Sequence, residues 1–258
     1  MSEPKAPADK KAQESGFLET VKVIVQALVI ALVIRTFLFQ PFNIPSSSLV
    51  PTLLVGDYLF VSKYSYGYSK HSIPLSPPLF SGRIFASEPK RGDIAVFKLP
   101  RDPSIDYIKR VIGLPGDRIQ MIDGVLHING QPVPKQKLSS KEINAGAGYQ
   151  DQATYFRETL PNGVSYTIQE LEKFGNKLGR NTSVYVVPEG HFFMMGDNRD
   201  NSLDSRDMSS QGVGYVPFDN FVGRAEIIFF SVTEDSVAWK VWEWPWTVRW
   251  SRLFNRIG

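Results

Sequence analysis

An apolar segment near the N-terminus constrains the fold of this chain more than any other feature. Residues 23–34 are apolar apart from Gln26, and apolar side chains resume after Arg35. A membrane-spanning helix needs about 20 mainly apolar residues, and residues 18–39 reach that length. Lys22 and Arg35 lie near the two ends of this range, where long basic side chains reach the lipid headgroups. The sequence therefore predicts a transmembrane helix.

Two other interpretations of this segment are a cleaved secretory signal and a buried core helix. A signal peptide would use Lys10 and Lys11 as its basic region. Residues 35–42 contain no small-x-small pattern of the kind that marks a cleavage site. The marginal apolarity of the segment leaves the core helix open. Among the three interpretations, the sequence favours an uncleaved signal-anchor.

The charges on either side of the segment predict its orientation. Lys5, Lys10 and Lys11 precede it, whereas residues 40–60 contain no lysine or arginine. Because basic residues accumulate on the cytoplasmic side of membrane helices, we expect the N-terminus in the cytoplasm. Residues 41–258 would then lie across the membrane.

The rest of the chain has the pattern of a mostly β protein. Short β-branched and aromatic runs are separated by Gly, Pro, Asn and Asp. Asp123-Gly124, between two such runs, predicts a tight hairpin. Residues 76–89 are expected to form a loop. The expected strands are Tyr58–Lys63, Ile94–Lys98, Tyr107–Ile112, Arg118–Ile122, Val125–Ile128, Val184–Val187, His191–Met194 and Ala225–Ser231.

Three segments differ in composition from this β pattern. Residues 1–16 are rich in Lys, Ala, Glu and Ser, and we expect a disordered tail. Residues 132–180 are more polar and suggest an inserted subdomain. All five tryptophans lie between Trp239 and Trp250 among basic residues, which fits either a membrane interface or ordinary core packing. Pro245 argues against one uninterrupted helix there.

Composition also excludes several kinds of chemistry. The chain has no cysteine, so thiolate catalysis, cysteine-based zinc sites and disulfides are excluded. With only His71, His127 and His191 present, a multi-histidine metal site is not expected. The 29 basic and 26 acidic residues give a net charge of +3, too balanced to indicate nucleic acid as a partner.

Candidate chemistry begins with Ser46, Ser47 and Ser48, between Pro45 and Pro51 just past the apolar segment. Most serine clusters form turns, and a serine nucleophile needs a histidine or a neutral lysine as its base.

Lys109 lies inside an apolar β-type run, where strand alternation places it on the face of Tyr107 and Val111. Burial on that face would lower the lysine pKa toward neutrality. The alternative is that the lysine stem packs while its ammonium group reaches solvent.

A third candidate is the polar run of residues 194–206, whose short side chains suit either a solvated turn or a loop that supplies hydrogen bonds and ion pairs. Its spacing does not match a calcium loop, because the required glycine and glutamate are missing. His191 lies nearby in a strand-like run, which favours a structural role. A Ser-His-acid triad stays open, since triads are recognised by geometry.

Together these segments resemble bacterial type I signal peptidase, the leader peptidase family. The resemblance is carried by four motifs in the family's order: Ser-x-Ser-x-x-Pro-Thr-Leu, Arg-Gly-Asp-Ile-Ala-Val-Phe, Tyr-Ile-Lys-Arg-Val-Ile-Gly-Leu-Pro-Gly-Asp and Gly-Asp-Asn-Arg-Asp-Asn-Ser-x-Asp-Ser-Arg. It implies an antiparallel β-sheet catalytic domain of signal peptidase I type behind a transmembrane helix. Ser47 and Leu49 depart from the residues that many relatives have, glycine and methionine.

The resemblance also implies roles for individual residues. Ser48 is implied as the nucleophile, Lys109 as its general base, and Ser46 as an oxyanion donor beside the Ser48 backbone N–H. Ser202 corresponds to the hydroxyl that orients the lysine amine. The implied supporting ion pairs are Asp197 with Arg110 and Asp204 with Arg206, and the implied substrate-binding residues are Phe42, Ile44, Pro45, Leu49, Leu53, Tyr107 and Ile108.

We therefore expect a serine endopeptidase of the bacterial cytoplasmic (inner) membrane that removes signal peptides from secretory precursors. It would be single-pass and monomeric, with its catalytic domain on the periplasmic side, and would need no metal or organic cofactor. The expected units are a cytoplasmic tail (1–17), the signal-anchor helix (18–39), the catalytic β domain (40–131 and 181–234), an inserted β-rich subdomain (132–180) and a Trp-rich C-terminal segment (235–258) that would lie either at the membrane interface or in the core. Two alternatives are a non-enzymatic, membrane-tethered β module that binds exported chains and a self-cleaving Ser/Lys protease.

Overall fold

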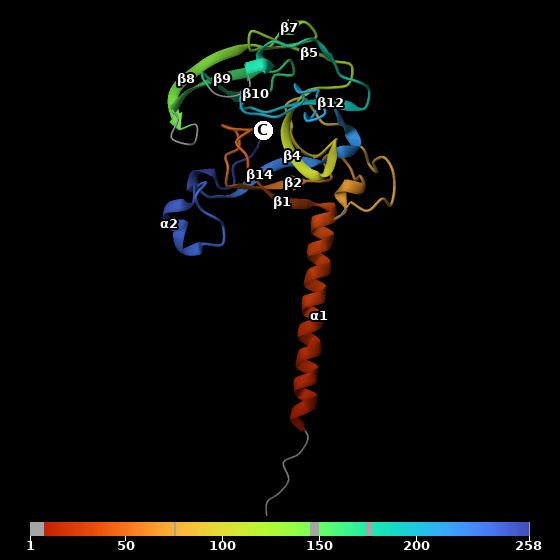
Figure 1. Cartoon of the computed structure of the whole chain (residues 1–258). Coiled ribbons are helices and arrows are strands. Elements are labelled where there is room, and N and C mark those ends of the chain that lie inside the picture. The colour runs from red at the N-terminus through yellow and green to blue at the C-terminus, as the bar shows by residue number, and fades with distance from the viewer. Residues whose placement is uncertain (1–7, 75, 145–149, 174–176, 258) are drawn as a thin grey trace, which may run out of the picture.

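A single long helix projects from a β-rich body (Figure 1). The computed structural model describes residues 8–74, 76–144, 150–173 and 177–257. Helix α1 spans Ala8–Phe37, so it begins inside the stretch predicted to be disordered and corrects that prediction from Ala8 onward. Its portion Phe17–Phe37 is long and apolar enough to cross a membrane, and none of it is buried against the rest of the protein. A buried core helix is therefore the wrong interpretation.

Seven antiparallel strands form the main sheet in the order β1-β2-β14-β3-β4-β12-β13. The late strand β14 lies between β2 and β3, so distant parts of the sequence meet in its centre. The pairing of β3 with β4 sets Ala95 opposite Lys109. The strands are β1 (Phe39–Asn43), β2 (Asp57–Ser62), β3 (Ile94–Leu99), β4 (Asp102–Gly113), β12 (His191–Met195), β13 (Val216–Pro217) and β14 (Phe221–Ser231).

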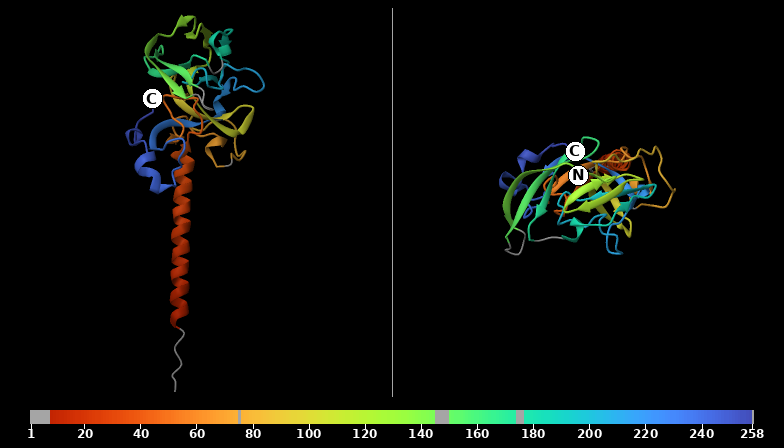
Figure 2. Two further views of the ribbon diagram at one scale, coloured as in Figure 1. Left: turned by 60° about the vertical axis from the view of Figure 1, so that its left-hand side comes forward. Right: turned by 90° about the horizontal axis from the view of Figure 1, so that it is seen from above.

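Two smaller sheets lie at the end of the body that is remote from α1 (Figures 1 and 2). One has the order β11-β5-β6-β7, from Tyr185–Val186, Arg118–Ile122, Val125–Ile128 and Gln131–Pro132. In it, Asp123 and Gly124 both have positive φ (48° and 75°), which confirms the predicted hairpin between β5 and β6. The other sheet has the order β10-β9-β8, from Ser165–Leu171, Gln150–Thr159 and Lys135–Asn144. It contains the β structure expected in residues 132–180.

One buried apolar cluster lies directly under the serine segment. Ile44, Leu49 and Leu53 flank the three serines and are at most 3% exposed. They pack with apolar side chains of β2, β3 and β14 such as Leu59 and Ile94. The main sheet thus fixes the chain on both sides of Ser46–Ser48.

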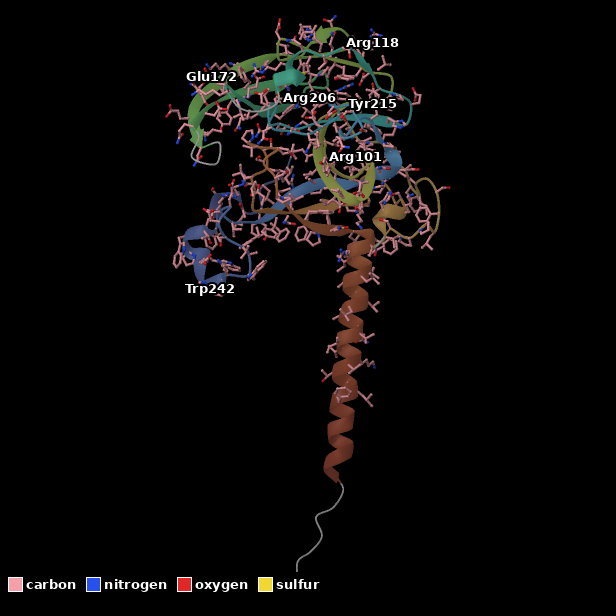
Figure 3. All side chains as sticks on the ribbon, viewed as in Figure 1. Arg101, Arg118, Glu172, Arg206, Tyr215 and Trp242 are labelled. Atoms are coloured by element: carbon pink, nitrogen blue, oxygen red, sulfur yellow. The ribbon has the colours of Figure 1, made fainter. Side chains whose placement is uncertain are left out.

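The Trp-rich segment folds back against the main sheet in short pieces. It forms two 3-10 turns and the short helix α2 (Trp244–Thr247), so no uninterrupted helix is present. Arg252 pairs with buried Asp57 (2.5 Å) and secures the segment. Four of the five tryptophans remain more than half exposed. Figure 3 places Trp242 on the side of the β body from which α1 extends.

Candidate active site

The serine segment is held by the polar loop that follows β12. Asn198 donates its backbone N–H to the Ser48 carbonyl (3.0 Å) and its side-chain amide to the Ser47 carbonyl (3.1 Å). Asn201 donates to the Ser47 hydroxyl (3.0 Å). On the other side, Leu53 N–H bonds the Leu49 carbonyl (3.0 Å) and closes a helical turn. The polar run 194–206 is therefore a structured loop that positions Ser48.

Strand β4 presents Lys109 to this segment. The Lys109 Nζ lies 2.6 Å from the Ser48 Oγ and 3.1 Å from the Ile108 carbonyl oxygen. The Nζ also lies 5.1 Å from the Tyr107 ring centroid, as the predicted strand alternation requires. Lys109 is 4% exposed, so its ammonium does not reach solvent as the alternative interpretation required.

Burial alters the protonation of Lys109. Desolvation lowers its pKa from 10.5 to about 8, against the opposing attraction of the Asp204 and Asp197 carboxylates. At neutral pH a usable fraction of the amine is therefore unprotonated. A neutral amine within hydrogen-bond reach of a serine hydroxyl is able to accept its proton.

The ion pair of Arg110 and Asp197 lies directly behind this contact. Arg110 points to the opposite face of β4 and forms a bidentate pair with Asp197 (2.8 and 2.7 Å), with both side chains 1% exposed. Thr52 donates its hydroxyl to the same carboxylate, and Arg110 also bonds the Gly92 carbonyl (2.8 Å). The pair joins β4, the serine segment and the polar loop into one rigid unit.

The second expected pair, Asp204 with Arg206, is also present. Arg206 contacts both carboxylate oxygens at 2.8 Å, and the Gly196 N–H donates to Asp204 (3.0 Å). Burial raises the pKa of Asp204, but the Arg206 ion pair and these hydrogen bonds outweigh it, so the pKa stays below its ordinary value. Asp204 is consequently a carboxylate at neutral pH.

The hydroxyls of Ser46 and Ser202 are not held by short hydrogen bonds among the described residues. The exposed Ser46 Oγ lies 3.5 Å from the Ser48 Oγ. The Ser202 Oγ is buried and makes no hydrogen bond of normal geometry among the described residues. The expected hydrogen bond from Ser202 to the Lys109 amine is therefore not present in this structure. A Cβ at Gly196 would lie 2.2 Å from the Ser202 Oγ, which explains the glycine there.

The expected substrate-binding residues divide into two groups. Ile44, Leu49 and Leu53 are buried in the core and offer almost no surface. Phe42 and Ile108 are partly buried and pack on that cluster. Tyr107 is also partly buried, and Pro45 is exposed. Of the expected substrate-binding residues, only Phe42, Pro45, Tyr107 and Ile108 therefore keep appreciable exposed surface.

Sequence reasoning missed an ion pair that joins the loop to the inserted sheet. Arg199 bonds Glu158 of β9 (2.6 Å to Oε1), and Tyr166 of β10 donates to the other oxygen (2.8 Å). Arg199 and Glu158 are both at most 3% exposed. Arg199 belongs to the polar run that the sequence singled out, but nothing near Glu158 indicates its partner.

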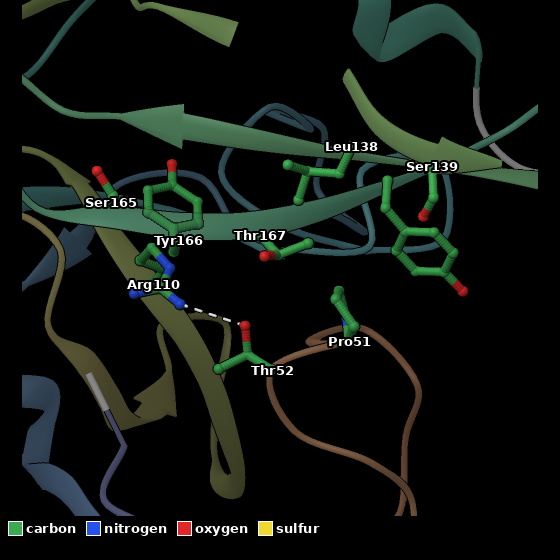
Figure 4. A pocket seen from close by; sticks show the side chains of 9 residues that line it. Pro51, Thr52, Arg110, Leu138, Ser139, Ser165, Tyr166 and Thr167 are labelled. Carbon is green, nitrogen blue, oxygen red and sulfur yellow. Dashed lines mark hydrogen bonds between the residues drawn. The ribbon is translucent and has the colours of Figure 1, made fainter. Parts of the chain in front are cut away.

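A cavity of about 430 Å³ separates the serine segment from the inserted sheet (Figure 4). Its walls include Pro51 and Thr52 on one side and Tyr155, Tyr166 and Thr167 on the other. In Figure 4 the dashed line joins the Arg110 guanidinium to the Thr52 hydroxyl, at 3.4 Å.

The basic side chain beside Ser48 is a lysine and not a histidine. Among the described residues, no group of three or more His, Asp or Glu side chains could hold a metal ion. The ring of His191 bonds a backbone carbonyl, that of Glu189 (2.9 Å), and the base that the structure brings to Ser48 is Lys109.

The helical anchor, the antiparallel β body and the comparisons with known proteins define a membrane-anchored peptidase. The family described as "Signal peptidase, peptidase S26" matches residues 17–230, and the chain belongs to this family.

Curated relatives include signal peptidase I of Rickettsia typhi, which is 44% identical over 89% of this chain and 90% of its own length. Signal peptidase I of Rickettsia conorii is 43% identical over 89% of each chain. A solved signal peptidase I from Enterococcus faecalis V583 is 28% identical, covering 54% of this chain and 97% of that chain, with a TM-score of 0.30.

Proposed function

We propose that this chain removes N-terminal signal peptides from exported precursors, with Ser48 as the nucleophile and Lys109 as its general base. The observation that carries this assignment is the 2.6 Å contact between the Ser48 Oγ and the buried Lys109 Nζ. The family membership supports the reaction, and the apolar helix α1 supports attachment to a membrane. The structure adds a lysine whose lowered pKa suits proton transfer near neutral pH.

The reaction follows from this geometry in two halves. Ser48 Oγ attacks the carbonyl carbon of the scissile bond while the neutral Lys109 amine takes the hydroxyl proton. Lys109 then gives this proton to the leaving amide nitrogen, which departs as the new N-terminus and leaves an ester on Ser48. A water molecule gives a proton to the same amine, attacks the ester and releases the signal peptide, and the proton returns to Ser48.

Stabilisation of the oxyanion falls to the Ser48 backbone N–H and the Ser46 hydroxyl. The Ser46 Oγ lies 3.5 Å from the Ser48 Oγ and is exposed, so it is free to turn toward a bound carbonyl. A donor of this kind contributes about 3–4 kcal/mol to transition-state stabilisation.

The buried ion pairs support the dyad without joining the chemistry. Arg110 with Asp197 fixes β4 against the serine segment, and Arg206 with Asp204 fixes the polar loop. Ser202 lies in the same loop, and its hydroxyl would have to turn toward the Lys109 amine in order to orient it.

The side chains of Phe42, Pro45, Tyr107 and Ile108 form a shallow surface beside the nucleophile, above the floor made by Ile44, Leu49 and Leu53. Such a surface accepts small residues at positions −1 and −3 of a signal peptide. Large side chains at these positions would meet the packed core instead of a pocket.

The same proposal includes the division of the chain and its topology. Residues 1–17 would lie in the cytoplasm and residues 18–39 in the inner membrane, with the catalytic β domain (40–131 and 181–234) and the inserted sheet of residues 132–180 on the periplasmic side. This orientation is supported by the lysines that precede α1 and the lack of basic residues in 40–60. Most tryptophans of residues 235–258 are exposed, and Trp242 lies on the side of the β body from which α1 extends, which suits the headgroup region. The enzyme would act as a monomer.

The test is cleavage of a secretory precursor by the purified full chain in detergent. Ser48→Ala and Lys109→Ala should each abolish cleavage, whereas Ser47→Ala, which removes the neighbouring hydroxyl, should keep most of it. Cleavage that survives in either dyad variant would refute the assignment. An unprocessed precursor that nevertheless binds the wild-type chain would favour the non-enzymatic module.

A further inference from the structure

A small polar cavity lies where the end of α1 meets the β body, away from Ser48. It has a volume of about 130 Å³, the space of about four water molecules in the liquid. Its walls are strongly polar and come from five parts of the chain, namely the last turn of α1, β1, the segment after β2, the β3–β4 hairpin and Val222 of β14. The side chains that matter here are those of Arg35, Gln40, His71, Ser76, Lys98 and Asp106.

The position of this cavity relative to the anchor is fixed by contacts. The Tyr68 hydroxyl donates to the Phe37 carbonyl (2.9 Å), and the two rings meet edge to face at 5.7 Å. These contacts hold Tyr68 against the end of α1, and Figure 1 shows the following loop beside that end. Leu79 and Phe85 in this loop are 71% and 83% exposed, which suits contact with lipid. With Phe17–Phe37 spanning a membrane, the cavity would lie at the level of the headgroups.

The charges around the cavity leave an excess of positive charge. Lys98 pairs with Asp106 (3.0 Å), whereas Arg35 is exposed and has no ion pair among the described residues. Lys63 is 1% exposed nearby, and burial lowers its pKa to about 8, so most of it is charged at neutral pH. Burial also lowers the pKa of His71, which is therefore mostly neutral. Arg35 and Lys98 therefore share the cavity wall with one carboxylate, and Lys63 adds a third positive charge close by.

We propose that this cavity binds the phosphate group of an anionic phospholipid. The Arg35 guanidinium offers a planar fork for two phosphate oxygens, and Lys98 offers a second cation. The Ser76 hydroxyl, bonded to the His71 ring (3.1 Å), supplies a neutral polar partner. A headgroup without its own cation, such as glycerol, fits best because the cluster repels choline or ethanolamine.

Such a lipid would define how the β body sits on the membrane. Gln40 lies on β1, and this strand runs directly into the segment that carries Ser48. A headgroup bound beside Arg35 and Gln40 would hold the start of this segment at a constant depth. The site goes beyond peptide cleavage and does not depend on the catalytic assignment.

The experiment measures lipid retained by the full chain in an uncharged detergent, using native mass spectrometry. Wild type, the double variant Arg35→Gln/Lys98→Gln and the control Arg118→Gln are each mixed with phosphatidylglycerol or phosphatidylcholine. Glutamine at position 98 keeps a donor for Asp106, and Arg118 is an exposed arginine at the end of the body remote from α1 (Figure 3). Arg35→Gln alone, on the exposed helix face, repeats the test without touching the β fold.

Wild type and the Arg118→Gln control should retain one phosphatidylglycerol per chain in preference to phosphatidylcholine. Each cation removed should weaken retention about fivefold, and the double variant about twenty-five-fold. Inorganic phosphate that displaces the lipid would identify free phosphate as a second source of the same group, and failure to displace it would leave lipid alone. Equal retention by wild type and both Arg35 variants would overturn the proposal, as would an equal loss in the control.

Discussion

The rate of cleavage should depend on pH through the protonation of Lys109. With a pKa of about 8, the amine is neutral in about 1% of molecules at pH 6, about 9% at pH 7 and half at pH 8. A lysine of ordinary pKa would be neutral in only about 0.03% at pH 7. Burial of Lys109 therefore makes about 300 times more of the active form available under neutral conditions.

The assay is kcat/KM for a signal-peptide substrate, measured with the full chain in detergent between pH 5.5 and 9.5. The rate should rise about tenfold per pH unit at the acidic end and level off above about pH 8. Between pH 6 and pH 8 the total gain should be about fiftyfold. A profile that is flat over this interval would refute a lysine base, and a midpoint near 6.5 would point to histidine instead.

Three further perturbations test the energetics of the site. Burial of Lys109 at a lowered pKa destabilises the fold below about pH 8, and this cost disappears as the pH rises toward 10.5. In denaturant titrations, Lys109→Met should therefore raise the unfolding free energy by about 2–3 kcal/mol at pH 7 and leave it unchanged at pH 10.5. Asp197→Asn leaves the Arg110 guanidinium buried without its counter-ion, so it should lower the unfolding free energy by about 3–5 kcal/mol in the same titrations. A loss below about 1 kcal/mol would show that the ion pair is dispensable for stability. Ser46→Ala should lower kcat by about 10²–10³ with little change in KM, and an unchanged kcat would remove Ser46 from the oxyanion site.

The strands that the sequence predicted have either an alternating burial pattern, as β5 and β6 do, or a run of buried apolar residues, as β3 does. Strands β5 and β6 alternate in this way and flank Asp-Gly, so both ends were predicted correctly. Strand β8 is exposed along almost its whole length, and its polar sequence carries no alternation to detect. Strand β1 contains Pro41, which argues against a strand but is tolerated because β1 is at the edge of the sheet.

The candidate site was predictable where chemistry is local and not where it depends on distant pairing. Lys109 could be assigned a face from strand alternation alone, and the structure confirms that face. The contacts of Thr52 with Asp197 and of Glu158 with Arg199 join residues that are far apart in sequence. Helix α1 begins earlier than expected because the residues after Ala8 include strong helix formers despite their polar character.

The pKa of Lys109 results from two opposing effects, and Arg206 controls one of them. Burial favours the neutral amine, whereas the Asp204 and Asp197 carboxylates favour the ammonium. Arg206 contacts both oxygens of Asp204 at 2.8 Å and so neutralises much of its field at Lys109. Arg206→Gln would leave a negative charge facing the amine and remove a nearby positive one, and both changes stabilise the ammonium.

The pH profile of Arg206→Gln should therefore shift toward alkaline pH, with a lower rate at pH 7 and recovery at higher pH. Loss of the ion pair by itself would lower the rate equally at all pH values, so recovery distinguishes an electrostatic role from a structural one. A second variant, Arg206→Lys, keeps the charge and should return the midpoint most of the way toward that of the wild type. A midpoint that stays at the wild-type value in Arg206→Gln would mean that burial alone sets the pKa of Lys109.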